Sequence, residues 1–128
     1  MDDRGYHTIW DITGASAQLL RNDCVLHDFF LNALQASGFT VISDIFHKFS
    51  AGGEGVTGLF LLSESHLSYH TYPESCYISI DVYTCGKIST AMNDDIAEFF
   101  GRTVEVNRRT LMRGSAVCSR GVVHENYQ

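Results

Sequence analysis

The sequence predicts an α+β fold, a two-layer α/β sandwich with a mainly antiparallel sheet and two main helices. Runs rich in β-branched and aromatic residues cluster in pairs along the chain, and stretches with the apolar spacing of helices lie between them. Strands arranged in this way suggest one sheet covered by helices. Because 128 residues is about the size of one domain, we expect residues 1–128 to form a single unit.

A strand and a helix are expected first. Residues 6–12, YHTIWDI, read as a strand whose side chains alternate between two faces. Residues 23–37 have apolar side chains at helical spacing, and Asp23 is placed to cap the start of this helix. Gly38 follows at the position where a left-handed residue commonly ends a helix. We expect this helix to cover the sheet.

The next two strands are expected on either side of a turn. Residues 39–49, FTVISDIFHKF, are β-branched and aromatic, which is typical of a strand. The glycine-rich segment 50–55, SAGGEG, predicts a flexible turn. Residues 56–63, VTGLFLLS, are nearly all apolar, so we expect a second strand that is buried.

Pro73, the only proline of the chain, interrupts it before another strand at residues 76–85. The alternation in CYISIDVYTC places the two isoleucines and Val82 on one face of this strand. By the same alternation, Cys85 points away from that apolar face.

The second main helix is expected to begin at Ser89 or Thr90 and to end at Gly101. Its buried stripe would consist of two phenylalanines, a methionine and an isoleucine. The segment 102–109, RTVEVNRR, predicts a last strand. From Thr110 onward the sequence gives no clear structural signal.

The charge and the N-terminus of the chain argue against two classes of partner. The net charge is −6 and the acidic residues are scattered, so there is no basic stripe to bind nucleic acid. The N-terminus MDDRGYH is acidic, unlike a signal peptide, and the longest apolar run, LFLL, is too short to span a bilayer. We therefore expect no nucleic-acid or membrane partner, and a cytoplasmic location.

The cysteines are expected to be thiols. They form no C-x-x-C pair, and a reducing compartment would keep them unpaired. Most such cysteines simply pack as small apolar groups, so a chemical role for any one needs a second argument. The four are Cys24, Cys76, Cys85 and Cys118.

The segment 62–73, LSESHLSYHTYP, is unusually rich in serine and histidine. It lacks the glycines of the G-x-S-x-G turn that presents a hydrolase nucleophile. His66 and His70 are four residues apart and could share one face of a helix, as zinc ligands do. However, the glutamate of H-E-x-x-H is missing and no third ligand is marked, so no metal is expected. Taken alone, the segment would read as a polar turn.

The segment does not stand alone. The run GVTGLFLLSESHLSYHTYPE, followed by IDVYTCG, resembles the prokaryotic S-adenosylmethionine decarboxylases, small pyruvoyl-dependent enzymes that cut their own chain. The resemblance is dense from about Phe46 to Gly86, and the combination of E-S-H, H-T-x-P-E and T-C-G is specific. Outside this block, YHTIWDI resembles the first strand of the family and VEVNRR the last.

The resemblance implies that the chain cuts itself between Glu64 and Ser65, into a fragment 1–64 and a fragment 65–128. The Ser65 hydroxyl would attack the carbonyl of Glu64 to give an ester, and β-elimination would convert Ser65 into the covalent pyruvoyl cofactor. By family match, the hydroxyl of Thr57 stabilises the oxyanion and His70 takes the Cα proton.

The resemblance also implies roles in turnover. Cys85, the cysteine of T-C-G, would protonate the carbanion that remains after carbon dioxide leaves, and a thiol is a workable acid at neutral pH. Phe49 and Glu74 match positions that stack the adenine and bind the ribose hydroxyls. Alternatively, Phe49 is a core aromatic. Tyr72 lies in the same pocket, where the family usually has tryptophan.

Two further departures from the family pattern concern the substrate pocket. Lys87 follows T-C-G where an acid is usual, and the turn SAGGEG is longer than the common form. Some members of the family have changed substrate and decarboxylate ornithine or arginine, so the residues leave more than one substrate open.

The sequence therefore leaves three functions open. The leading one is decarboxylation of S-adenosylmethionine, which gives the aminopropyl donor for spermidine synthesis. The second keeps the mechanism but acts on L-ornithine or L-arginine, to form putrescine or agmatine, with Asp81 or another acid pairing the distal cation. The third is an uncleaved, inactive paralogue that regulates a partner subunit. Because family members are dimers, a homodimer of cleaved protomers with active sites at or near the interface is expected.

Overall fold

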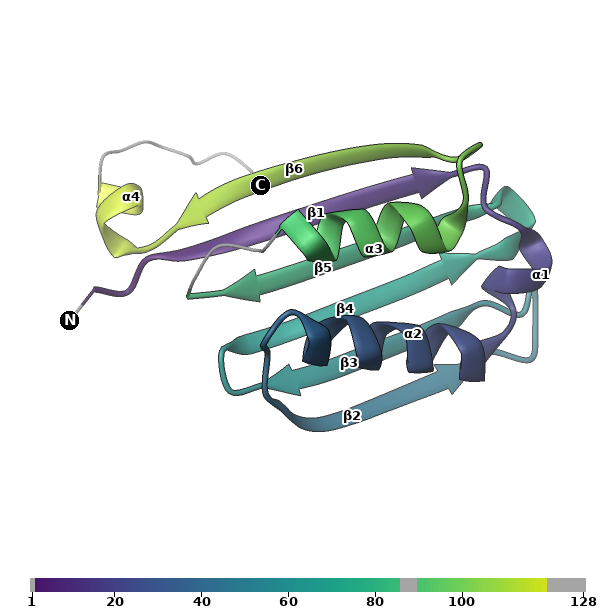
Figure 1. Ribbon diagram of the computed structural model, residues 1–128, viewed down its shortest axis with the longest axis horizontal. Coiled ribbons are helices and arrows are strands. Elements are labelled where there is room, and N and C mark those ends of the chain that lie inside the picture. The colour runs from purple at the N-terminus through teal and green to yellow at the C-terminus, as the bar shows by residue number, and fades with distance from the viewer. Residues whose placement is uncertain (1, 86–89, 120–128) are drawn as a thin grey trace.

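The structure is a computed structural model that describes residues 2–85 and 90–119 (Figure 1). Its sheet has the strand order β2-β3-β4-β5-β1-β6, and all neighbouring strands are antiparallel. The strands are β1 (Gly5–Thr13), β2 (Val41–Lys48), β3 (Val56–Leu62), β4 (Ser65–Tyr72), β5 (Tyr77–Thr84) and β6 (Glu105–Arg113). The predicted mainly antiparallel sheet is confirmed.

Two long helices cover one face of this sheet. In Figure 1, α2 (Asp23–Ala36) crosses in front of β3 and β4, and α3 (Thr90–Phe100) crosses in front of β5 and β1. The core lies between the two layers, where apolar side chains of the helices meet the apolar positions of the strands. The largest fully buried side chains include Trp10, Phe30, Leu34, Phe60, Tyr69 and Ile80. The two-layer α+β sandwich with two main helices is therefore confirmed.

The opposite face of the sheet is not covered by any helix of the described ranges, and we call it the open face. Leu59 and Leu61 of β3 lie there and are 47% and 52% exposed. The expectation of a strand buried throughout is thus wrong, because only alternate residues of β3 face the helices. The open face carries Thr57, Leu59, Leu61, His66, Ser68, His70, Ser79, Asp81, Tyr83, His7, Ile9 and Asp11.

The ends of the helices differ in part from expectation. Asn22, not Asp23, caps α2, because Oδ1 of Asn22 accepts a hydrogen bond from the backbone N–H of Val25 at 3.2 Å. The left-handed glycine was predicted correctly, since Gly38 has φ 89°. The short helices were not predicted: α1 (Ala17–Leu20), the 3₁₀ turn η1 (Pro73–Ser75) and α4 (Ser115–Ser119).

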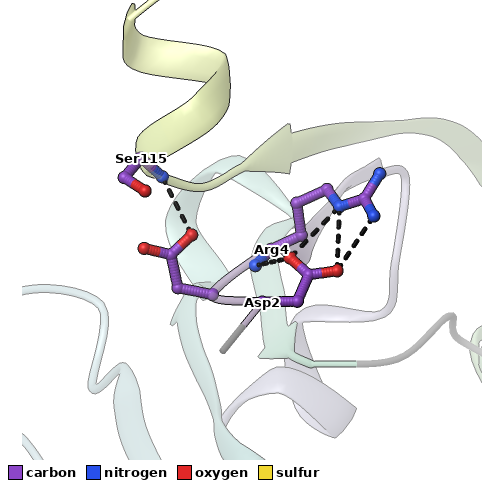
Figure 2. Close-up of polar contacts among 4 residues, drawn as sticks. Asp2, Arg4 and Ser115 are labelled. Atoms are coloured by element: carbon purple, nitrogen blue, oxygen red, sulfur yellow. Dashed lines mark hydrogen bonds and ion pairs between the residues drawn. The ribbon is translucent and has the colours of Figure 1, made fainter.

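The C-terminal strand is longer than predicted. β6 continues through Thr110 to Arg113, because the whole segment pairs with β1, from Thr13↔Glu105 to Gly5↔Arg113. Figure 2 shows how α4, which follows β6, is tied to the N-terminus. The backbone N–H of Ser115 donates to Oδ1 of Asp3 at 3.1 Å, and Arg4 pairs with Asp2 at 2.9 Å. None of the helices in the described ranges is long and apolar enough to cross a membrane.

Candidate active site

The segment rich in serine and histidine is a strand, β4, and not the helix or polar turn that it resembled in isolation. The true turn is the two residues before it, Ser63 and Glu64, because Leu62 of β3 pairs directly with Ser65 of β4. The connection before β2 holds this turn in place: Thr40 accepts from the N–H of Ser63 at 3.0 Å and donates its own N–H to the Glu64 carboxylate at 3.3 Å.

Ser65 adopts a backbone conformation that side chains other than glycine rarely adopt. Its φ is 145°, and the bond predicted to break is the peptide bond that enters this residue. Such a conformation ordinarily costs on the order of 1–3 kcal/mol, and it persists only where the surrounding structure enforces it. Here the enforcing structure is the tight turn between two paired strands. The predicted cleavage point thus coincides with a strained residue.

Ser65 and Cys85 lie at the same end of neighbouring strands. Ser65 pairs with Thr84 across β4 and β5, and Cys85 is the next residue after Thr84. Cys85 is exposed, as the alternation of β5 predicted. The imidazole of His66 also lies at this end, with Nδ1 3.2 Å from Oγ of Ser65. We call Glu64, Ser65 and Cys85 the turn end of the site.

The other predicted residues gather at the opposite end of β3 and β4. Thr57 and His70 pair across these strands, and the Thr57 hydroxyl forms a hydrogen bond with Nδ1 of His70. The ring of Tyr72 packs edge-on against His70, with 4.4 Å between ring centroids. The Phe49 ring lies 6.0 Å from His70. We call the five residues Thr57, His70, Phe49, Tyr72 and Glu74 the loop end.

A cavity of about 280 Å³ occurs at the loop end. Phe49, His70, Tyr72 and Glu74 line it together with the glycine-rich loop that follows β2. Phe49 is 43% exposed, so it is not a core aromatic. A Cβ on Gly53 would lie 2.0 Å from Oε1 of Glu74, so any larger residue there would push the Glu74 side chain aside. The Glu74 carboxylate therefore lies directly against the loop backbone.

The structure thus divides the predicted residues into two groups within one chain. Ser65 and His70 are five residues apart on one extended strand, which corresponds to about 16 Å. The two ends appear at opposite ends of β3 and β4 in Figure 1. Neither Thr57 nor His70 can reach the Glu64–Ser65 bond of its own chain in this fold.

Sequence reasoning missed a polar network on the open face between the two ends. Nε2 of His7 lies 2.7 Å from Oδ2 of Asp81, and the Ser68 hydroxyl donates to Oδ1 of the same carboxylate. Arg113 reaches Nδ1 of His7 at 3.3 Å, and its guanidinium lies 4.8 Å from the centroid of the Tyr83 ring. These residues come from four strands, so only the strand register could have revealed them.

A second polar contact missed from the sequence supports the loop end. Tyr77 stacks on Tyr72, with 5.5 Å between ring centroids, and its hydroxyl donates to Oδ1 of Asp11. Burial, together with the hydrogen bond to Asp11, raises the pKa of Tyr77 to about 12. The phenol is therefore a neutral hydrogen-bond donor at physiological pH.

Comparison with known proteins places this arrangement in a family. Residues 6–114 match the family model described as S-adenosylmethionine decarboxylase, and this range includes both ends of the site. The chain belongs to the S-adenosylmethionine decarboxylase family. The family match confirms the resemblance seen in the sequence, and it extends well beyond the block in which that resemblance was dense.

Individual relatives agree with the family model. The chain is 40% identical over 113 residues to an S-adenosylmethionine decarboxylase proenzyme of Geobacillus kaustophilus, covering 84% of this chain and 90% of that one. It is 34% identical over 121 residues to a proenzyme of the same name from Thermoplasma volcanium, covering 92% and 90%. The crystal structure of the adenosylmethionine decarboxylase from Aquifex aeolicus superposes with a TM-score of 0.76 at 28% identity, covering 100% of this chain and 99% of that one.

The resemblance to the family extends to residues that the structure does not describe. Lys87, which departs from the usual acid after T-C-G, lies outside the described residues, as does Gly86. Within residues 2–85 and 90–119, no group of three or more potential ligands is arranged to hold a metal ion. Asp81, the candidate partner for a basic substrate, has both carboxylate oxygens engaged by His7 and Ser68.

Proposed function

We propose that this protein is a self-processing, pyruvoyl-dependent decarboxylase of S-adenosylmethionine, which supplies the aminopropyl donor for spermidine synthesis. The observation that carries the proposal is the match of residues 6–114 to this family, within which the relatives are named as proenzymes. The matched range contains the Glu64–Ser65 turn and every residue assigned a role below.

Processing begins at the turn end. The Ser65 hydroxyl adds to the carbonyl carbon of Glu64, the amide bond to the Ser65 nitrogen breaks, and an ester forms. Loss of the Cα proton of Ser65 then expels the Glu64 carboxylate, and water converts the remaining dehydroalanine into a pyruvoyl group and ammonia. The products are a fragment 1–64 and a fragment 65–128. In this step Thr57 stabilises the oxyanion and His70 accepts the Cα proton.

The distance between the two ends supports a homodimer. A separation of about 16 Å prevents Thr57 and His70 from acting on Ser65 of the same chain. In a two-fold dimer with its open faces in contact, the loop end of one copy meets the turn end of the other, and both sites are completed at once. The exposed Leu59 and Leu61 would be covered in the same interface.

The residues at the turn end fit the pyruvoyl group. Ser65 is half-buried at the start of β4, and cleavage would make it the first residue of its fragment, beside the exposed Cys85. The ketone of this group serves as the electron sink for decarboxylation. The thiol of Cys85 is then placed to deliver the proton that replaces carbon dioxide.

Substrate binding is assigned to the loop end. The half-exposed face of Phe49 suits stacking of an adenine ring, and the Glu74 carboxylate suits a pair of ribose hydroxyls. Tyr72 closes the same cavity from the β4 side. No observation favours a basic amino acid as substrate, because Asp81 already has partners for both oxygens. An inactive paralogue is not favoured either, since each residue assigned to processing is present.

The first experiment measures cleavage and substrate together. Purified wild-type protein should give two fragments by intact mass, with a carbonyl that reacts with hydrazine, whereas Ser65→Ala should remain one chain. Carbon dioxide release should then be fastest with S-adenosylmethionine when this compound, ornithine and arginine are compared at equal concentration. An intact wild-type chain would refute the enzyme, and faster release from ornithine or arginine would refute only the substrate.

A second experiment tests the shared site. Ser65→Ala and His70→Ala should each remain uncut when expressed alone. When the two are expressed together, the His70→Ala chain should be cut, because its intact Ser65 meets His70 of the Ser65→Ala copy. If the mixture stays uncut although mixed dimers form, the sites are not shared between copies.

A further inference from the structure

We propose that His66 is the base that activates the Ser65 hydroxyl in the first step of self-cleavage. This inference rests on the proposed function and adds a residue to it. The roles assigned so far leave one proton unassigned, since Thr57 stabilises the oxyanion and His70 takes a proton from carbon only later. A serine hydroxyl is a weak nucleophile until a neighbouring base accepts its proton.

The geometry points to His66. Its Nδ1 lies 3.2 Å from Oγ of Ser65, within the range of a base in contact with the proton it removes. His70 of the same chain is about 16 Å away along β4 and cannot serve. The contact is between neighbouring residues of one chain, so it forms in every copy, whether or not a second copy is bound.

The surroundings hold the imidazole in place on the open face. His66 is half-buried between β3 and β5, where it pairs with Leu61 on one side and Tyr83 on the other. The ring of Tyr83 lies 6.0 Å from that of His66 and carries the Arg113 guanidinium over it. No carboxylate is among these packed neighbours.

The step is balanced without any further reactant. The Oγ proton of Ser65 passes to Nδ1 of His66 while Oγ forms a bond to the carbonyl carbon of Glu64. The tetrahedral carbon then expels the Ser65 nitrogen, which takes the proton back from the imidazolium. An ester and a free amine result, and His66 returns to its neutral form. The φ of 145° at Ser65 is released in the same event, because the amide bond that imposes it is lost.

The test follows cleavage of freshly synthesised chains over time on a denaturing gel. His66→Gln keeps the size and polarity of the side chain but cannot accept a proton, so cleavage should slow by about 10²-fold or more. Ser63→Ala, a change to an exposed residue of the same turn, should cut at the wild-type rate. Cleavage of His66→Gln at the wild-type rate, while wild type is cut normally, would overturn this inference and leave the proposed function intact.

Hydroxylamine separates the first step from the second, because it cleaves esters and leaves amides intact. In His70→Ala the ester should accumulate, so hydroxylamine should release the two fragments. In His66→Gln no ester should form, so hydroxylamine should release none. Equal release from both variants would show that the ester forms without His66 and would overturn the proposal.

A further measurement excludes a merely structural role. Free imidazole should accelerate cleavage of His66→Ala, because it can occupy the vacated space and accept the proton. Failure of the imidazole rescue in a folded variant would contradict the assignment.

Discussion

Tyr69 and His27 join the two layers of the fold through one buried hydrogen bond of 2.8 Å between the tyrosine hydroxyl and Nδ1 of the imidazole. Burial raises the pKa of Tyr69, so its hydroxyl stays protonated. Nε2 of His27 lies 2.6 Å from Oδ2 of Asp44, so the imidazole is hydrogen-bonded through both of its nitrogens. One side chain of α2 thus binds both β4 and the edge strand β2, and Tyr69 directly precedes His70.

We expect Tyr69→Phe to lower the free energy of unfolding by about 1–3 kcal/mol, because Nδ1 of the buried His27 would lose its hydrogen-bond partner. The measurement is chemical denaturation in the Ser65→Ala background, where the chain stays in one piece. Tyr77→Phe is the matched control. It should cost less, since the Asp11 side chain it leaves is 33% exposed and can be hydrated. Equal losses from the two variants would contradict this account.

The same tyrosines predict a loss of stability at high pH. An unfolded tyrosine ionises near pH 10, whereas the pKa of folded Tyr69 is raised by burial and that of Tyr77 is raised to about 12. Their contribution to stability is fully present below pH 10 and falls as the pH rises through 10 toward 12. Unfolding free energies measured from pH 9 to 11 should therefore decrease, and less steeply in Tyr69→Phe.

Gly53 should affect substrate binding and not processing. A methyl group on this residue would displace the Glu74 carboxylate, so Gly53→Ala should raise the KM for S-adenosylmethionine, as Glu74→Gln should, while self-cleavage continues. Gly38→Asn is the control, because Gly38 also has a positive φ, 89°, has open space around it and does not line the cavity. An unchanged KM in Gly53→Ala would remove Glu74 from the binding site.

Cys85 should act only after cleavage. We expect Cys85→Ala to be processed like wild type, while decarboxylation falls by about 10²-fold or more, as for the loss of a positioned proton donor. Cys24→Ala is a fair control, since Cys24 is also exposed but lies on α2. Intact mass gives the extent of processing, and carbon dioxide release gives turnover. Turnover at the wild-type rate would leave Cys85 without a chemical role.

The strain at Ser65 can be measured in chains that do not cut themselves. Neither Ser65→Ala nor Ser65→Gly has a hydroxyl to react, but glycine adopts a φ of 145° without the penalty that alanine pays. We expect the glycine variant to be more stable toward unfolding by about 1–2 kcal/mol, despite the greater flexibility of glycine in the unfolded chain. A more stable alanine variant would show that the turn imposes no strain.

Helices and strands whose apolar residues recur at a regular spacing were predictable from the sequence. Those whose form depends on contacts with residues distant in the sequence were not. The alternation in β5 correctly placed Cys85 on the exposed side, and the helical spacing located α2 and α3. β3 was misjudged because Leu59 and Leu61 are apolar residues on an uncovered face. The end of β6 was missed because residues 110–113 owe their extended form to pairing with β1.

For the candidate site, the residue types were predictable from the sequence, but their positions relative to one another were not. Its residue types came from a family resemblance, but their separation into two ends became visible only once residues 65–72 were known to be one extended strand. The contacts of Asp81 with His7 and Ser68 depend on the register of β1, β4 and β5. No spacing within the sequence encodes that register.

The strand order affects the stability of the protein after cleavage. The proposed cut at the Glu64–Ser65 bond would leave β1, β2 and β3 in fragment 1–64, while β1 lies between β5 and β6, which would belong to fragment 65–128. The two pieces are therefore interleaved, and neither can leave without dismantling the sheet that both build. Once the bond is cut, unfolding liberates two molecules and refolding requires them to find one another again, so stability comes to depend on concentration.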